Sequence, residues 1–108
     1  MAVAFNIGAA LLDALVLSVV AKEPSYGYRI TQEVRSIMTV SESTLYPVLR
    51  RLQKEGYLDT YDQEYAGRNR RYYRVTLAGS QALEQYRAEW QEYRAQIDQM
   101  LLEGDVAQ

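Results

Sequence analysis

A short basic segment at residues 68–74 is the part of this sequence whose residue types are best suited to chemistry. It holds four of the twelve Lys and Arg residues of the 108-residue chain, with an asparagine and two tyrosines among the arginines. The whole chain has 14 acidic residues and a formal net charge of −2, so the segment concentrates positive charge in an acidic protein. Arginines interleaved with tyrosines are typical of surfaces that bind a phosphate backbone. The segment therefore favours nucleic-acid binding.

Catalytic chemistry has little support in the composition. The chain contains no histidine, which is the commonest general base and transition-metal ligand, and no cysteine. No carboxylate pair is flanked by the residues that acid–base catalysis needs. We therefore expect no enzyme, no metal site and no cofactor. The absence of cysteine also rules out a disulfide framework and fits a cytoplasmic location.

One apolar run, residues 9–21, raises the question of a membrane segment. Its 13 residues are too few to span a bilayer, and they include Asp13. No Lys or Arg precedes Lys22, although a secretory signal needs a positive start. We expect a helix that is buried on more than one side and no contact with a membrane. A domain of this size has a thin core, so one side of this helix, with Leu12, is expected to meet another subunit.

The elements that must position the basic segment follow one another closely. We expect helices at residues 8–21, 26–36 and 43–56, strands at 57–62 and 70–76, and a long helix at 77–102. Gly104, just after this helix, would mark its end. Ser25 is the expected N-cap of the second helix. Pro47 argues for a third helix that starts as late as Ser43, because proline is tolerated only near a helix start. Residues 63–69 would form a protruding loop between the strands.

This order of elements predicts a mainly α fold with a small β-hairpin. It is the order of a winged helix-turn-helix domain followed by a long C-terminal dimerisation helix. Residues 1–76 would form the DNA-binding domain, which includes the N-terminal helix. Residues 77–108 would form the dimerisation helix.

The third helix has two distinct faces when its residues are placed 100° apart. Leucines at positions 45, 49 and 52 share the core face. The outer face carries Ser43, Pro47, Arg50 and Lys54, with Tyr46 and Arg51 on its flanks. A slim N-terminal end followed by basic residues suits a helix that enters the major groove. The alternative is an ordinary solvated helix face.

The second strand would form the wing that carries the basic segment. Alternation places Arg70, Tyr72 and Arg74 on one face. The other face holds Arg71 and two residues expected to pack inward, Tyr73 and Val75. With Arg68 at the tip, the arginines at 68, 70 and 71 are the expected phosphate contacts. A charged edge strand that resists aggregation is the alternative, although four arginines exceed that need.

The last helix carries a heptad seam that predicts a homodimer. Its members are Leu83, Tyr86, Trp90, Tyr93, Ile97 and Met100. From residue 75 onward, six acidic residues and two arginines give a net charge of −4, whereas residues 1–74 carry ten basic and eight acidic residues, a net +2. The helix is therefore suited to a protein partner rather than DNA. Packing onto the first helix of its own subunit is the alternative, and we expect both.

Several motifs together resemble the PadR-like transcriptional regulators. They are YGYRI at 26–30, TLYPVLRRL at 44–52, EGYL at 55–58 and RRYYRVT at 70–76, followed by Gly79 and Leu83. The resemblance runs in order from about residue 11 to the end of the last helix. It implies a cytoplasmic, dimeric winged-helix repressor from a prokaryote or its phage. The single last helix is similar to that of a compact subgroup that includes multidrug-sensing repressors.

The resemblance also implies roles for individual residues. Tyr26, Ser43, Thr44 and Tyr46 would contact DNA together with the wing arginines. Ser43 stands where the family often has glycine, so helix entry into the groove and base preference could differ. In the drug-sensing subgroup a tryptophan at the place of Trp90 stacks on flat ligands in a central cavity.

The sequence as a whole predicts a dimeric DNA-binding repressor that a small aromatic ligand releases. Trp90, flanked by Tyr86 and Tyr93, is the expected ligand contact, and a tryptophan that merely fills the dimer interface is an equal alternative. A winged-helix module that binds another protein instead of DNA is the alternative for the whole chain.

Overall fold

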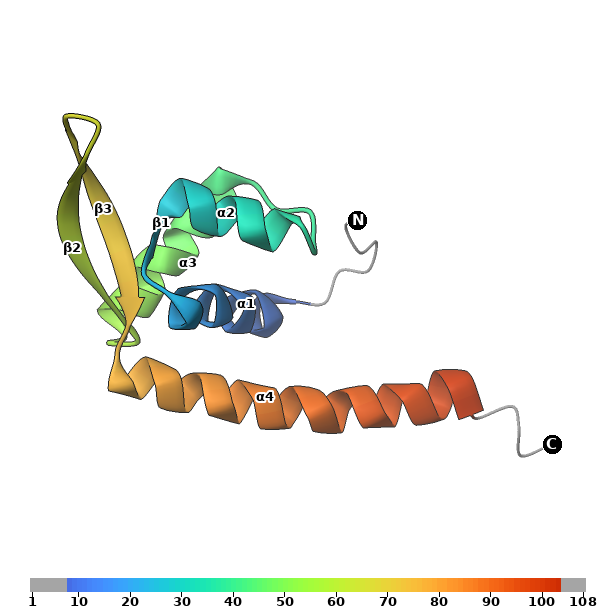
Figure 1. Ribbon diagram of the computed structural model, residues 1–108. Coiled ribbons are helices and arrows are strands. Elements are labelled where there is room, and N and C mark those ends of the chain that lie inside the picture. Colours follow the sequence, from blue (N-terminus) through green and yellow to red (C-terminus); the bar gives the residue numbers. More distant parts are fainter. Residues whose placement is uncertain (1–7, 104–108) are drawn as a thin grey trace.

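The structure of the protein, a computed structural model, describes residues 8–103. Its elements are α1 (Ala9–Lys22), β1 (Ser25–Tyr26), α2 (Gly27–Arg35), α3 (Glu42–Lys54), β2 (Leu58–Tyr65), β3 (Arg68–Val75) and α4 (Leu77–Asp98), which continues as a π-helical turn, Gln99–Glu103. The fold class is the predicted winged helix-turn-helix with a long last helix (Figure 1). The ends of the two predicted domains, 1–7 and 104–108, and the predicted helix end at Gly104 lie outside the described residues.

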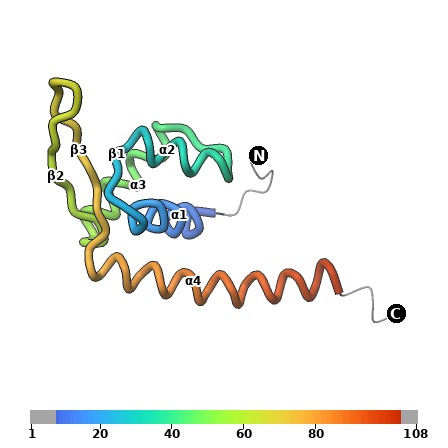
Figure 2. The backbone as a smooth tube through the Cα atoms, in the orientation of Figure 1, coloured from blue at the N-terminus to red at the C-terminus, as the bar shows by residue number. Residues whose placement is uncertain are grey.

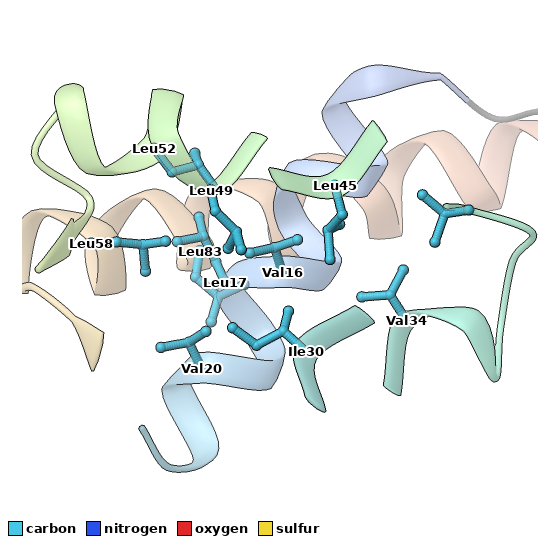
Figure 3. Close-up of a cluster of buried hydrophobic side chains, with 11 residues drawn as sticks. Val16, Leu17, Val20, Ile30, Val34, Leu45, Leu49, Leu52, Leu58 and Leu83 are labelled. Atoms are coloured by element: carbon cyan, nitrogen blue, oxygen red, sulfur yellow. The ribbon is translucent and has the colours of Figure 1, made fainter. Parts of the chain in front are cut away.

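The core lies where α1, α2 and α3 meet the base of the sheet and the start of α4 (Figure 3). The three leucines of α3, Leu45, Leu49 and Leu52, are fully buried, as the helical spacing predicts. They meet Val16 and Leu17 of α1 and residues of α2. Burying one such side chain contributes about 1.5–3 kcal/mol. The core therefore fixes the orientation of α3 and leaves its opposite face to solvent.

A salt bridge joins α1 to α3 beside this core. The carboxylate of Asp13, which is only 7% exposed, accepts a hydrogen bond from Nη2 of Arg51 at 2.6 Å. Arg51 also donates to Glu55 at 3.3 Å. Arg51 is therefore held against α1, away from the outer face of α3. The charge of Asp13 within the apolar α1 is thus paired with Arg51. No helix among residues 8–103 is long and apolar enough to cross a membrane.

The wing is longer than the sequence predicts. β2 and β3 pair along their whole length, from Leu58 with Val75 to Tyr65 with Arg68. The turn consists of Ala66 and Gly67 alone, with φ of 54° and 79°. Two consecutive residues with positive φ match the twist of a tight hairpin, so the predicted loop at 63–69 is wrong. The strands consequently extend well away from the helices (Figure 2).

A short strand before α2 replaces a predicted helix cap. Ser25 and Tyr26 form β1, which pairs with Tyr73 and Tyr72 and makes β3 the central strand of a sheet of order β1-β3-β2. Tyr26, without a side-chain hydrogen bond, is the N-cap of α2, so the prediction of Ser25 as the cap is wrong. The Ser25 hydroxyl is buried and finds no hydrogen-bond partner within the described residues. Pairing of its backbone with β3 determines the local conformation instead.

The third helix begins one residue earlier than predicted. Ser41 is its N-cap, and the Ser41 hydroxyl accepts from the backbone N–H of Thr44 at 3.2 Å. Glu42 is therefore the first helical residue, and Pro47 is the sixth rather than the fifth. The missing N–H of Pro47 removes one backbone hydrogen bond. Burial of the three leucines and the serine cap offset that loss.

Candidate nucleic-acid interface

A groove between α3 and the wing brings together the residues predicted to bind DNA. Its volume is about 420 Å³. Five of the nine predicted DNA contacts line it: Tyr26, Tyr46, Arg50, Arg70 and Arg71. They come from β1, α3 and β3, and the sequence separates the first from the last by more than 40 residues. The sheet and the buried face of α3 thus create one basic surface from three separate segments.

The other predicted contacts lie around this groove. Ser43 and Thr44 are exposed at the N-terminal end of α3, where their hydroxyls form hydrogen bonds with the Ser41 hydroxyl at 2.9 and 3.1 Å. Lys54 is exposed at the opposite end of α3, and Arg68 adjoins the turn of the wing. Polar side chains therefore continue along the outer face of α3 beyond the groove.

The ring of Tyr46 packs onto the start of α2. A Cβ atom at Gly27 would lie 2.7 Å from Cε1 of Tyr46, so a larger residue there would displace the ring. The Tyr46 hydroxyl makes a long hydrogen bond of 3.5 Å to Oε1 of Glu42. Burial, and then the negative charge of Glu42, raise the pKa of Tyr46. Tyr46 therefore stays protonated at neutral pH and can donate a hydrogen bond to a ligand.

Gly27 is a residue that sequence reasoning missed. The sequence shows it only as part of the YGYRI motif, although a glycine at a helix start is a signal that a neighbouring group passes close to the backbone. The space left by the missing side chain of Gly27 lets the ring of Tyr46 pack at the edge of the groove.

One face of the wing alternates tyrosine and arginine side chains. The guanidinium carbon of Arg70 lies 3.9 Å from the ring centre of Tyr26 and 4.0 Å from that of Tyr65. Tyr72 stacks on Tyr61 with ring centres 5.6 Å apart, and it meets Tyr26 edge-on at the same distance. The predicted alternation of β3 holds, since Tyr73 and Val75 on the opposite face pack against the core.

Sequence reasoning missed Tyr61 and Tyr65, which belong to β2. The only signal was their spacing of four residues, which places both on one face of a strand. Their partners on β3 follow from a register that the two-residue turn sets.

The cations of this surface are largely free of acidic partners. Within residues 8–103, no salt bridge involves Arg50, Lys54, Arg68 or Arg70. Arg71 has one distant partner, Asp62, at 3.9 Å, and both side chains are mostly exposed. Such an exposed pair contributes at most about 1 kcal/mol and is readily exchanged for a phosphate. The groove therefore presents a positive surface to an anionic polymer.

A second cavity of about 290 Å³ lies between α1 and α4. It brings together the three residues predicted to bind a ligand, Tyr86, Trp90 and Tyr93. Small residues of α1, Ala10 and Ala14, line its other side, and Glu89 is the acidic residue at its edge. Burial, and then the charge of Asp13, raise the pKa of Tyr86. The cavity has aromatic walls and open access, which suits a flat apolar molecule.

The predicted dimer seam divides into two parts along α4. Leu83 is 4% exposed, and Leu12 and Tyr86 also pack against the core of the same chain. The later members are exposed, up to 78% for Met100. Figure 1 shows α4 continuing past the end of α1. The exposed apolar side chains of this portion are Trp90, Tyr93, Ile97, Met100, Leu101 and Leu102, of which sequence reasoning missed the last two.

Known proteins share this fold and sequence. The regulator Rv3488 of Mycobacterium tuberculosis is 37% identical over 83 residues, which cover 76% of this chain and 78% of that protein. The crystal structure of smu.1704 from Streptococcus mutans is 42% identical with a TM-score of 0.87, covering 92% of this chain and 93% of that chain. Bacillus subtilis PadR in complex with operator DNA is 25% identical with a TM-score of 0.64, covering 70% of this chain and 46% of that chain.

A family model described as the transcriptional regulator PadR-like family matches residues 16–85. That match includes the last part of α1, the whole winged helix-turn-helix and the first turns of α4. The groove and the wing lie within it, whereas Trp90 and the exposed end of α4 follow it. The chain belongs to the PadR-like family of transcriptional regulators.

Proposed function

We propose that this protein is a dimeric repressor that binds operator DNA in the cytoplasm. The observation that carries the proposal is the groove that is lined by Tyr46 and Arg50 of α3 and by Arg70 and Arg71 of the wing. α3 would enter the major groove, where its exposed polar side chains reach base edges. The wing arginines and Tyr26 would hold the phosphate backbone and fix the register. The operator complex of Bacillus subtilis PadR supports this use of the fold.

Two copies of the chain would assemble through α4 and α1. The apolar residues Trp90, Tyr93, Ile97, Met100, Leu101 and Leu102 of α4 remain 37–78% exposed within the single chain. A second α4 would bury them and leave the wings free. Two α3 helices would then read successive major grooves of a near-palindromic site, about 34 Å apart. The net negative charge of α4 is consistent with its pointing away from DNA.

A flat aromatic ligand would bind in the cavity between α1 and α4 and release the DNA. Trp90 and Tyr93, with ring centres 6.2 Å apart, offer two aromatic surfaces beside the small residues of α1. Because the cavity adjoins the proposed dimer interface, a ligand there would change how the two subunits are spaced. A changed spacing of the α3 helices would weaken binding to two half-sites at once.

A mobility-shift titration against fragments of the source genome tests the DNA-binding role. We expect a small number of fragments to shift at low protein concentration while the rest stay free. Uniform weak binding to every fragment would favour a winged-helix module whose partner is another protein. Sedimentation of the free protein at the same concentrations should give the mass of two chains.

Trp90 provides a direct test of the ligand cavity, because it is the sole tryptophan of the chain. We expect planar aromatic compounds to quench its fluorescence saturably and to release DNA over the same concentration range. Trp90→Ala should remain dimeric and bind DNA, while compounds no longer release it. If no compound of a varied panel quenches Trp90 while Trp90→Ala still sediments as a dimer, the tryptophan only fills the interface.

A further inference from the structure

We infer that Tyr65 is a positioning residue for DNA binding, because its ring holds the guanidinium of Arg70 in the orientation needed to bind a phosphate. The inference rests on the proposed function and adds to it a residue at the tip of the wing. Tyr65 itself need not touch DNA. Its contribution is to hold Arg70 against Tyr26, in an arrangement that exists before DNA arrives.

The register of the sheet explains how the two rings reach Arg70. β3 is the central strand, so Tyr26 on β1 and Tyr65 on β2 approach it from opposite sides. Tyr26 pairs with Tyr72, and Tyr65 pairs with Arg68, so both rings are diagonal neighbours of Arg70. Diagonal neighbours on one face of a sheet are within reach of long and aromatic side chains. Arg70 is consequently half-buried although it lies on the open face of the wing.

The rings leave the hydrogen-bonding groups of Arg70 available. A guanidinium donates its N–H groups in its own plane, whereas aromatic rings interact with its flat faces. Within residues 8–103, Arg70 makes no salt bridge or side-chain hydrogen bond that would use those donors. Arg70 lines the groove between α3 and the wing, and its planar donors remain available for a bidentate contact with a phosphate.

The other arginines of the wing are held less firmly. Arg71 has only the distant Asp62, and Arg74 lies 5.1 Å from the ring centre of Tyr61. A free arginine side chain loses conformational freedom when it binds, and stacking on an aromatic ring removes part of that loss in advance. Arg70 is the one wing arginine that the described structure places on two rings. Tyr65 thus adds affinity without adding charge.

The test measures operator affinity and its salt dependence for substitutions at Tyr65. Tyr65→Leu is expected to weaken binding about 5- to 30-fold, since an exposed cation–π contact is lost once in each subunit. The slope of log K against log salt should stay unchanged, because Arg70 keeps its charge. Tyr65→Phe keeps the ring and should bind as tightly as the wild type. Tyr65 is 56% exposed, so the fold should tolerate both changes, and thermal melting verifies this.

Two further variants separate positioning from a general effect on the wing. Tyr61→Leu removes a ring from the same face of β2 without touching Arg70, and it should weaken binding less than twofold. Arg70→Gln should lower both the affinity and the salt slope, and adding Tyr65→Leu to it should change nothing further.

Three outcomes overturn the inference while leaving DNA binding intact. They are wild-type affinity for Tyr65→Leu, an equal loss for Tyr61→Leu, and an undiminished loss for Tyr65→Leu when Arg70 is already glutamine. Failure of the wild-type protein to discriminate among DNA sequences would instead overturn the proposed function, and this inference with it.

Discussion

Gly79→Ala destabilises the fold by about 3 kcal/mol or more, as expected when a well-packed site is overfilled against rigid backbone. A Cβ atom at position 79 would overlap the carbonyl oxygen of Tyr57 and would lie 2.7 Å from Cγ2 of Val75. Neither neighbour can rotate away, since the first is backbone and the second is a stiff β-branched side chain. The start of α4 would have to move away from the base of the wing.

The hydrogen bonds at this junction make such a movement costly. The Thr76 hydroxyl caps α4 by accepting from the N–H of Gly79 at 3.0 Å, and it donates to the carbonyl of Gly56 at 2.6 Å. The Thr76 N–H also donates to the carbonyl of Tyr57. Displacing α4 therefore breaks its cap as well as its packing.

The expected loss of stability is opposite in sign to the effect of helix propensity. On helix propensity alone, alanine would stabilise a helix over glycine by about 1 kcal/mol. Urea denaturation monitored by circular dichroism measures the free energy of unfolding. Ser80→Ala, on the exposed neighbouring position, is the matched control and should change stability by less than about 0.5 kcal/mol. A Gly79→Ala variant as stable as the wild type would show that the close packing of α4 on Tyr57 is wrong.

The double substitution Arg70→Ala with Arg71→Ala is expected to weaken operator binding by about 100- to 1,000-fold. A dimer would lose four phosphate contacts, and each charged hydrogen bond contributes about 1 kcal/mol or somewhat less in so exposed a groove. The slope of log K against log salt should fall by about 3 to 4, because each lost contact removes about 0.9. The loss should be similar for operator and for unrelated DNA, since phosphates carry no sequence information.

A control with the same change in net charge tests whether position matters. Arg87→Ala with Arg94→Ala also removes two arginines per chain, from α4, where they pair with Glu84 and Asp98. We expect operator affinity and salt slope to stay within a factor of about two of the wild-type values, because α4 is distant from the groove. Equal losses in the two double variants would mean that overall charge, rather than the wing, governs binding.

The sequence predicts those parts of the fold that depend on local pattern. The spacing of Leu45, Leu49 and Leu52 predicts the buried face of α3, and alternation in β3 predicts which side of the wing packs inward. The helix order and the family follow from the same patterns. The sequence does not predict features that depend on backbone segments far away along the chain. Ser25 looks like a helix cap until β3, nearly 50 residues later, pairs with it.

The same contrast between local pattern and distant contacts holds for the candidate site. The sequence shows its basic residues, but it does not show the contacts that orient them. The contact between the side chains of Arg70 and Tyr65 depends on the strand register, which a two-residue turn sets, and a seven-residue loop would have separated the two side chains. In the same way, Arg51 seems available on the flank of α3 until Asp13, 38 residues earlier, binds it.

Selection of binding sites from a random DNA library by the wild-type protein tests the central claim most directly. A dimer that reads DNA with two copies of α3 should enrich a near-palindromic sequence with half-sites about 10 base pairs apart. The enriched site should bind at least about 1,000-fold more tightly than a shuffled sequence at physiological salt. A library without any common sequence after repeated rounds, or equal affinity for the enriched and shuffled sites, would contradict the assignment of α3 and the wing as a sequence-specific DNA interface.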